Sequence, residues 1–316
     1  MPERLVAAGT TDVRSVREII WPRFVAASGR SAELDYRQDV STTRLLAAVQ
    51  NAPLAERPDV VFVSDPAEFA AAGLTETIDV ASTKSYPQGW LDPERRWWPL
   101  YVQPVVAVHN SYRGEPPQSW SDLGDIRFRD RLVFEEPARM VTTGPSLAEL
   151  SAVMDAASWE NLVASLAAQR PMIVGDNERS VLEVATGSRW VGLSNWNVAL
   201  RLRKGSPVRM KFLDPTPCIP GFGVLVPGGN SPDVGREFLR WLATDEGQQA
   251  YSATGRVPAL LDIDAPTALR NVLPPTIAPL HGAVDWVARP RPWADRFRTL
   301  FGTVGTQIRD LKTAMA

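Results

Sequence analysis

The chain has almost no cysteine, little histidine and no long apolar segment. Its 316 residues include one cysteine and two histidines, so an internal disulfide cannot form. No apolar run approaches the roughly 18 residues that a membrane-spanning helix needs. The run from Pro104 to Val108, for example, is only long enough for a strand. We therefore expect neither a disulfide framework nor a membrane span.

A block of positive charge is also missing. The net charge is -2 at pH 7, the pI is about 5.9, and lysines and arginines are scattered along the chain. We therefore do not expect nucleic acid as a partner. A hydrophobic content of 44% and a charged content of 22% are typical of a packed globular protein, and the length is sufficient for two domains.

The first residues, Met1 to Leu5, lack both the charged and the apolar region of a signal peptide. They also contain no cysteine that could carry a lipid. Two interpretations stay open at this point. Either a signal has been removed from this chain and the protein is periplasmic or extracellular, or the protein is cytoplasmic.

Strand and helix patterns alternate along most of the chain. Apolar or alternating runs predict strands at 5–8, 32–36 and 60–63, and residues at helical spacing predict a helix after each of the first two. This alternation is typical of a parallel sheet covered by helices. Further strands are predicted at 102–108, 132–134, 172–174, 191–193 and 221–226. The Pro- and Trp-rich stretch 86–99 is expected to be irregular.

A short strand followed by a capped amphipathic helix is the clearest late pattern. Val234, Phe238, Trp241 and Leu242 fall on one helical face. Ser231 is a favourable N-cap and the proline that follows it is a favourable first helical residue.

Five motifs occur in a characteristic order. They are the capped loop at 39–43, D-V-V-F-V-S-D at 59–65, PP-x-S-W-x-D-L at 116–123, E-P at 136–137 with the Thr/Gly/Ser loop 142–146, and E-F-L-x-W-L-x-x-D-E-G-Q at 237–248. In this order they resemble bacterial extracellular solute-binding proteins of ABC importers, in particular the group of ferric-ion, thiamine and polyamine binders. The resemblance extends from Leu5 to about Pro258.

The resemblance implies a type II periplasmic-binding-protein fold. This is an α/β fold of two lobes, each a mostly parallel sheet with covering helices, with a ligand cleft between them. We expect lobe I to comprise 1–105 and 222–262, and lobe II to comprise 106–221 and 263–316, with hinge strands near 102–108 and 222–226. The implied role is to capture a small polar solute and deliver it to a membrane permease, as a monomer and without a cofactor or catalysis.

Ligands of open α/β sheets bind beyond the carboxyl ends of the strands. The loops at those positions supply the candidate ligand-binding residues. They are Thr10, Thr11, Asp12, Ser41, Thr42, Asp65, Thr142, Thr143, Gly144, Ser146, Asn177, Asn195, Trp196 and Asn197.

The hydroxyl-rich loops at 41–43 and 142–146 each open a helix. A helix N-terminus with free N–H groups and hydroxyl donors suits a phosphonate, a phosphorylated compound or another organic anion. The alternative for each loop is simple helix capping. Trp196 either stacks on a ligand or packs between elements, and Asp65 either binds an organic cation such as thiamine or a polyamine or serves as a turn residue.

Iron is not expected despite the resemblance. Ferric binders carry a Tyr-Tyr pair where this chain has Asn195 to Asn197, and this chain has Thr10-Thr11 where a histidine is expected. The two histidines, His109 and His281, lie elsewhere. Because ferric iron requires hard anionic oxygen ligands, we assign no metal.

Cys218 is the basis of an alternative function. Some proteins of similar sequence are cytosolic enzymes that use a cleft cysteine, as in thiamine degradation, and a ligand sensor is a related possibility. A reactive thiolate needs a base or positive charge nearby, and 215–220 contains no His, Lys or Arg. We therefore expect a binding protein rather than an enzyme.

Overall fold

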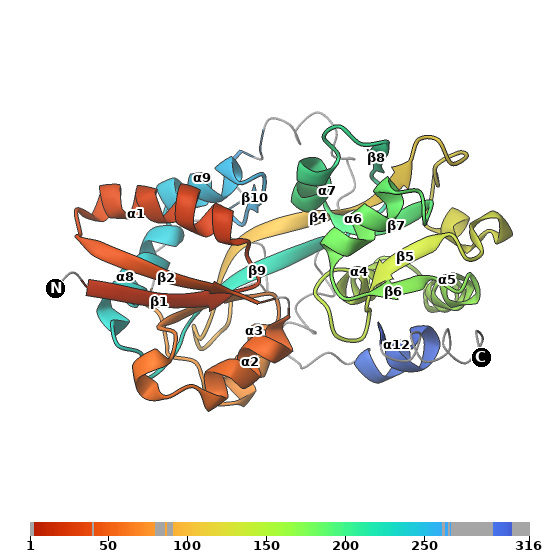
Figure 1. Ribbon diagram of the computed structural model, residues 1–316. Coiled ribbons are helices and arrows are strands. Elements are labelled where there is room, and N and C mark those ends of the chain that lie inside the picture. Colours follow the sequence, from red (N-terminus) through yellow and green to blue (C-terminus); the bar gives the residue numbers. More distant parts are fainter. Residues whose placement is uncertain are drawn as a thin grey trace, which may run out of the picture. The chain divides into compact units, whose positions relative to one another are not determined.

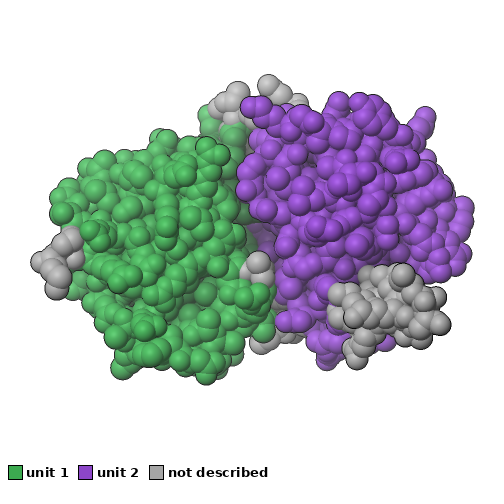
Figure 2. All heavy atoms as spheres, viewed as in Figure 1, with its two compact units in different colours: residues 1–103, 220–272, 284–290 green, residues 104–219, 273–283, 291–316 purple. Residues whose placement is uncertain are grey.

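The structure is a computed structural model that describes residues 3–39, 41–79, 86, 91–260, 263–264, 266 and 293–304. The chain divides into two compact units (Figure 2). Unit 1 comprises 1–103, 220–272 and 284–290, and unit 2 comprises 104–219, 273–283 and 291–316. The divisions at 103/104 and 219/220 fall within β4 (Trp98–Asn110) and β9 (Cys218–Leu225). The sequence predicts divisions at 105/106 and 221/222, which lie in the same two strands.

The sheet of unit 1 is built on three parallel strands. β1 (Glu3–Gly9) lies between β2 (Ala32–Gln38) and β3 (Val60–Val63), and both neighbours run parallel to it (Figure 1). All four residues of β3 are buried, as expected for an apolar run in the middle of a covered sheet. β9 pairs with β3 in the antiparallel direction, and β10 (Val257–Pro258) pairs with β4 in the same way.

Helices with apolar faces cover this sheet. They are α1 (Trp21–Ser28), which continues a π-helical turn at Ser15–Ile20, α2 (Thr42–Asn51), α3 (Pro66–Ala71), α8 (Pro232–Leu242) and α9 (Asp245–Ala253). The core has an aromatic centre, where the rings of Phe24 and Trp21 lie 4.9 Å and 5.3 Å from that of Phe238. The predicted apolar face of 232–242 is therefore the face that packs into the core.

Unit 2 has a second sheet, in which parallel and antiparallel strand pairs are mixed. β5 (Leu132–Glu135) runs parallel to β6 (Met172–Val174) and β7 (Val191–Asn195), while the later half of β4 pairs antiparallel with β7 and β8 (Val208–Lys211). Its helices are α4 (Thr143–Leu150), α5 (Ala156–Ala168), α6 (Asn177–Ala185), α7 (Trp196–Leu202) and α12 (Ala294–Phe301). Within the described part of the chain, no helix combines the length and apolar character needed to cross a bilayer.

Three local predictions differ from the structure. β4 begins at Trp98, inside the stretch that the sequence predicts to be irregular, and β9 begins at Cys218 rather than at 221. Ser231 does not cap α8 with its side chain. Its hydroxyl donates to the carbonyl oxygen of Arg4 at 2.9 Å, and its N–H donates to the carboxylate of Asp59 at 2.6 Å. Long-range partners thus override the local capping preference of a serine.

Candidate functional site

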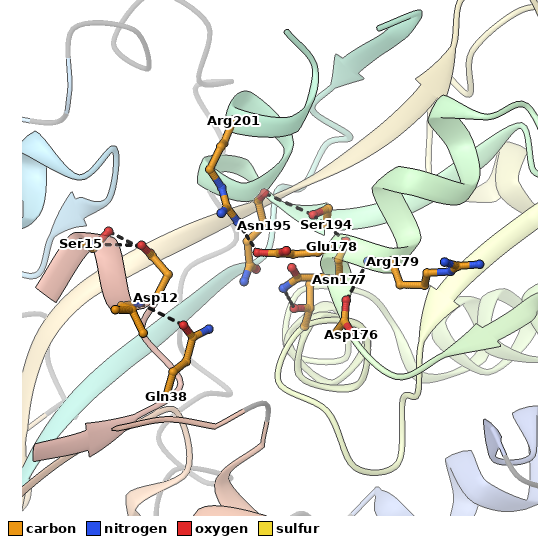
Figure 3. A network of polar contacts seen from close by, with 12 residues as sticks. Asp12, Ser15, Gln38, Asp176, Asn177, Glu178, Arg179, Ser194, Asn195 and Arg201 are labelled. Atoms are coloured by element: carbon orange, nitrogen blue, oxygen red, sulfur yellow. Dashed lines mark hydrogen bonds and ion pairs between the residues drawn. The ribbon is translucent and has the colours of Figure 1, made fainter. Parts of the chain in front are cut away.

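In unit 1, the loops that follow β1, β2 and β3 lie at one edge of the sheet. The strands are parallel, so their carboxyl ends meet there. The N–H of Thr10 donates to the carbonyl of Phe62 at 2.9 Å, and the N–H of Val13 donates to the side chain of Gln38 at 3.0 Å (Figure 3). The structure thus places the loop of Thr10 to Asp12 beside the ends of both neighbouring strands.

Thr11 and Asp12 are engaged by the protein itself. The carboxylate of Asp12 accepts hydrogen bonds from the N–H and the hydroxyl of Ser15, both at 2.8 Å, and from Arg256 at 2.9 Å. Thr11 shares a hydrogen bond of 3.0 Å with the hydroxyl of Tyr101. Burial alone favours the neutral carboxyl, but the charge and hydrogen bonds of Arg256 and Ser15 outweigh it and lower the pKa of Asp12. These two candidates therefore hold the loop in place.

The next loop contains one capping residue and one buried hydroxyl without a partner. Ser41 is the N-cap of α2, and its oxygen accepts from the N–H of Arg44 at 3.2 Å. Thr42 is fully buried, and its hydroxyl has no hydrogen-bond partner among the described residues. The hydroxyl of Thr43 donates to the carboxylate of Glu68 at 3.4 Å. Of these three hydroxyl groups, only that of Thr42 is buried without a hydrogen-bond partner among the described residues.

Asp65 is buried at the start of α3. It occupies the N-cap position, yet its carboxylate makes no capping hydrogen bond to the first turn. α3 is adjacent to α2, so Asp65 and the Ser41 loop belong to the same edge of unit 1.

In unit 2, the carboxyl end of β5 organises the second hydroxyl loop. The carboxyl group of Glu135 accepts from the N–H of Thr142 at 2.6 Å, and the amide of Asn177 donates to the Thr142 hydroxyl at 3.0 Å. Ser146 donates to the carbonyl oxygen of Thr142 at 2.7 Å. Thr142, Ser146 and Asn177 are therefore joined in one network and hold the start of α4.

The electrostatics of Glu135 are unusual. Burial removes water from its carboxyl group and raises its pKa from 4.5 to about 7, against the opposing effect of the hydrogen bonds from Thr142. The nearby charge of Asp176 raises the pKa further. Below neutral pH, this carboxyl group is therefore mostly uncharged.

Thr143 and Gly144 form the first turn of α4. Thr143 is fully buried, and its hydroxyl lacks a partner in the part of the chain that the structure describes. Gly144 has no room for a side chain, because an added Cβ would lie 1.9 Å from the carbonyl oxygen of Pro137 and 2.9 Å from Nε1 of Trp293. A close approach of backbone and indole thus requires glycine at this position.

The end of β7 and the first turn of α7 carry three more polar groups without a described partner. They are Oδ1 of Asn195, Nε1 of Trp196 and Oδ1 of Asn197. Trp196 is 5% exposed, and its ring stacks on that of Phe212 with centroids 5.3 Å apart. One face of this indole is therefore covered by protein. Figure 3 shows Asn195 and Ser194 beside Asn177, and the Ser194 hydroxyl donates weakly to the carbonyl oxygen of Asn177 at 3.5 Å.

Several buried polar groups of unit 2 lack a described partner near the carboxyl ends of two strands. β5 and β7 are parallel neighbours. Thr143 opens α4, the first α-helix after β5, and Asn195 to Asn197 lie at the junction of β7 and α7. A buried polar group without a partner costs roughly 1–3 kcal/mol, and such groups are uncommon in native proteins. These residues are therefore candidates for contact with a bound molecule.

Metal binding and catalysis by Cys218 are less well supported. Among the described residues, no group of three or more His, Cys, Asp or Glu side chains is arranged to hold a metal ion. The pKa of His109 is lowered by burial and by the charges of Arg209 and Lys211, and His281 lies outside the described residues. Cys218 is buried, and burial followed by the charge of Glu149 raises its thiol pKa, which is the opposite of an activated nucleophile.

Sequence reasoning missed three residues of this region. Glu135 directly follows the predicted strand 132–134, but nothing in the sequence indicated that it would accept a hydrogen bond from the N–H of Thr142. Arg256 and Trp293 reach their partners from far along the chain. In the sequence, each of these residues is a charged or aromatic residue close to a glycine or proline. That pattern does not show which distant residue the side chain will contact.

Comparison with known proteins gives a family and a fold. The sequence model of bacterial extracellular solute-binding proteins matches residues 58–279, more than half of the chain. Comparison with curated proteins gives no significant match.

Three solved structures are similar to the whole chain. Iron-bound HitA from Pseudomonas aeruginosa is 17% identical with a TM-score of 0.73, covering 96% of this chain and 100% of that chain. The substrate binding protein of an ABC transporter from Agrobacterium tumefaciens is 15% identical with a TM-score of 0.75, covering 95% and 94%. The periplasmic binding protein AfuA from Actinobacillus pleuropneumoniae, with fructose-6-phosphate bound, is 16% identical with a TM-score of 0.72, covering 95% and 98%. These similarities confirm the predicted α/β fold of type II periplasmic binding proteins.

Proposed function

The chain belongs to the family of bacterial extracellular solute-binding proteins, and from this premise we propose that it binds a small organic anion, such as a phosphorylated or phosphonate compound. Members of this family bind small ligands outside the cytoplasm and deliver them to the permease of an ABC importer. That role requires selective binding and release, and no covalent chemistry.

The single observation that carries the proposal is the Thr143 hydroxyl. It is buried without a described partner in the first turn of α4. The N-terminus of a helix carries partial positive charge, and an oxyanion is the ligand that such a position favours, although at α4 the N–H of Thr142 already donates to Glu135. A hydroxyl donor at the same place adds a further hydrogen bond to the anion.

Thr42 supports the same proposal from unit 1. It is the first residue of α2, and its hydroxyl is also fully buried without a described partner. AfuA, a solved structure of similar fold, is named with fructose-6-phosphate, which is an anion of the proposed class. Iron-bound HitA has the same fold, but among the described residues of this chain no group of three or more His, Cys, Asp or Glu side chains is arranged to hold a metal ion.

An organic cation is the second candidate, because one observation favours it. Glu136 is buried at the end of β5, and one of its carboxylate oxygens has no partner among the described residues. Such a carboxylate favours a cationic ligand, such as thiamine or a polyamine.

The test is a thermal-shift screen of the purified protein, followed by calorimetry on each compound that shifts the midpoint. The panel contains fructose 6-phosphate, simple phosphonates, dicarboxylates, thiamine, spermidine and ferric citrate. A ligand at 100 times its Kd stabilises the native state by about 2.7 kcal/mol. We expect anions to give the shifts and to be recovered unchanged. Shifts with thiamine or spermidine alone would contradict the anion proposal.

Substitutions identify which groups make the contact. Under the anion proposal, Thr42→Val and Thr143→Val weaken binding while Asp65→Asn has little effect. Under the cation alternative, Asp65→Asn abolishes binding. Thr43→Val is the matched control in unit 1, since Thr43 adjoins Thr42 on the same helix and its hydroxyl already has a partner in Glu68.

A further inference from the structure

The C-terminal helix α12 is built into unit 2. Phe297 is fully buried, and its ring lies 6.4 Å from that of Trp159 on α5. Phe301 packs edge-on against Phe134 of β5 at 6.4 Å, and Arg296 forms an ion pair with Glu160 of α5. Two buried aromatic rings and an ion pair thus fix α12 to α5 and to the strand that leads to the candidate site.

The residue just before α12 contacts the candidate site directly. Trp293 is 6% exposed, and its indole nitrogen lies against the backbone at Gly144, as the 2.9 Å distance to an added Cβ shows. The same added Cβ would lie 1.9 Å from the carbonyl oxygen of Pro137. The first turn of α4 therefore packs closely against the loop after β5 and against a tryptophan from the C-terminal segment.

A second tryptophan fixes the following turn of the same helix. Nε1 of Trp159 donates to the carbonyl oxygen of Leu147 at 2.6 Å. The ring of Trp159 is in turn covered by Phe297 and by the guanidinium of Arg296, 4.8 Å from its centroid. α12 thus supports α4 both through Trp293 and through Trp159.

We propose that Trp293 is a positioning residue for solute binding, which holds the first turn of α4 so that Thr143 faces the solute with a fixed geometry. The proposal rests on the function proposed above for Thr143. Binding groups need supporting contacts that hold them within about 0.5 Å of the productive position. The match to the family model ends at residue 279, so this support comes from a part of the chain that the family match does not include.

The first measurement needs no ligand. Hydrogen exchange of the backbone amides of 143–147 is compared between wild type, Trp293→Leu and Trp293→Phe. We expect faster exchange in Trp293→Leu and a smaller increase in Trp293→Phe. The control is Trp190→Leu, which makes the same change in unit 2 at a residue that lies over Arg131, and exchange at 143–147 should not change. Unchanged exchange in Trp293→Leu would overturn the proposal, whatever the protein binds.

The second measurement connects the position of α4 to affinity. Calorimetry with fructose 6-phosphate and with inorganic phosphate should give a Kd about tenfold higher for Trp293→Leu than for wild type, a change equivalent to about 1.4 kcal/mol. Trp293→Phe should recover part of the affinity, and Trp190→Leu should bind as wild type does. An unchanged Kd in Trp293→Leu would overturn the role in binding. If wild type binds neither probe while exchange at 143–147 changes as expected, the anion function is wrong and the support of α4 by Trp293 stands.

Discussion

The guanidinium of Arg256 lies 2.9 Å from the carboxylate of Asp12, a residue 244 positions earlier in the chain. Arg256 is 2% exposed and also donates to the hydroxyls of Ser15 and Thr254, while its guanidinium lies 5.0 Å from the ring centroid of Tyr101. A buried cation thus fixes the loop that follows the first strand of unit 1. Asp12 contributes to the site by holding its own loop, since both of its oxygens are already bound.

Removing the Arg256 charge should destabilise the protein strongly. Breaking a buried ion pair by deleting one partner costs about 3–5 kcal/mol, and the loss here should lie at the lower end because the Asp12 side chain is 26% exposed and keeps its hydrogen bonds from Ser15. We expect Arg256→Met to lower the free energy of unfolding by about 3 kcal/mol, measured by urea denaturation. The matched control is Arg14→Met, which removes the exposed pair with Glu18 and should cost less than about 1 kcal/mol. Equal losses in the two variants would contradict the assigned role of Arg256.

The raised pKa of Glu135 leads us to predict that the stability of the protein depends on pH. Its pKa is raised to about 7 in the folded protein from an ordinary value of 4.5. Between these values the folded state holds a proton that the unfolded state has released, so stability contributed by this group is complete below pH 4.5 and is lost as the pH rises through 7. The total change is roughly 3 kcal/mol at most, from about 1.4 kcal/mol per pKa unit.

Glu135→Gln isolates this effect because glutamine keeps an acceptor for the N–H of Thr142 and cannot ionise. Chemical denaturation at several pH values between 4.5 and 8 should show wild type losing stability relative to Glu135→Gln as the pH rises. Parallel curves for the two proteins would show that Glu135 is already ionised in the folded protein.

Cys218 should be unreactive in the folded protein. Burial raises the pKa of its thiol, and a thiol must ionise to react. We expect a chromogenic disulfide reagent to modify Cys218 only after denaturation, and Cys218→Ala to bind the solute with unchanged Kd. Rapid modification of the native protein, or consumption of a compound that stops in Cys218→Ala, would support the enzyme alternative instead.

Gly144 and Gly175 make a matched pair of glycines in unit 2. An added methyl group at Gly144 meets the carbonyl oxygen of Pro137 at 1.9 Å, whereas at Gly175 it meets nothing within 4 Å. Gly144→Ala should therefore lower the unfolding free energy by about 1–3 kcal/mol. Gly175→Ala should leave it unchanged or raise it by about 0.5 kcal/mol, since it restricts the unfolded chain. A thermal midpoint for Gly144→Ala equal to that of wild type would show that the close packing at α4 is looser than described.

The fold could be predicted from the sequence wherever a pattern was local. The four apolar residues at 60–63 predicted β3 with its observed bounds, and helical spacing predicted the buried face of α8. Prediction failed where distant residues decide the outcome. The hydroxyl of Ser231 binds Arg4 instead of capping its helix. β4 extends back to Trp98, and β10 pairs with it at Tyr101 and Val102.

The candidate site was predictable as a set of loops, but the roles of its residues were not. Hydroxyl groups at strand ends identified the loops, yet Thr142 and Thr143 look alike in the sequence and differ in the structure. The hydroxyl of Thr142 is bound by Asn177, and that of Thr143 has no described partner. Such a difference depends on side chains from other strands, which a single sequence does not place.

The most direct test of the account is Thr143→Val, measured by thermal unfolding without ligand and by calorimetry with the anion that shifts wild type most. A buried hydroxyl without a partner destabilises the free protein, so we predict an equal or higher midpoint for the variant. A lost hydrogen bond to a charged group is worth about 1.5–3 kcal/mol, so the Kd should rise about tenfold or more. Thr186→Val is the control in the same unit, since the Thr186 hydroxyl donates to the carbonyl oxygen of Glu183, and its Kd should match wild type. A lower midpoint with unchanged affinity in Thr143→Val would mean that this hydroxyl serves the fold and that the solute binds elsewhere.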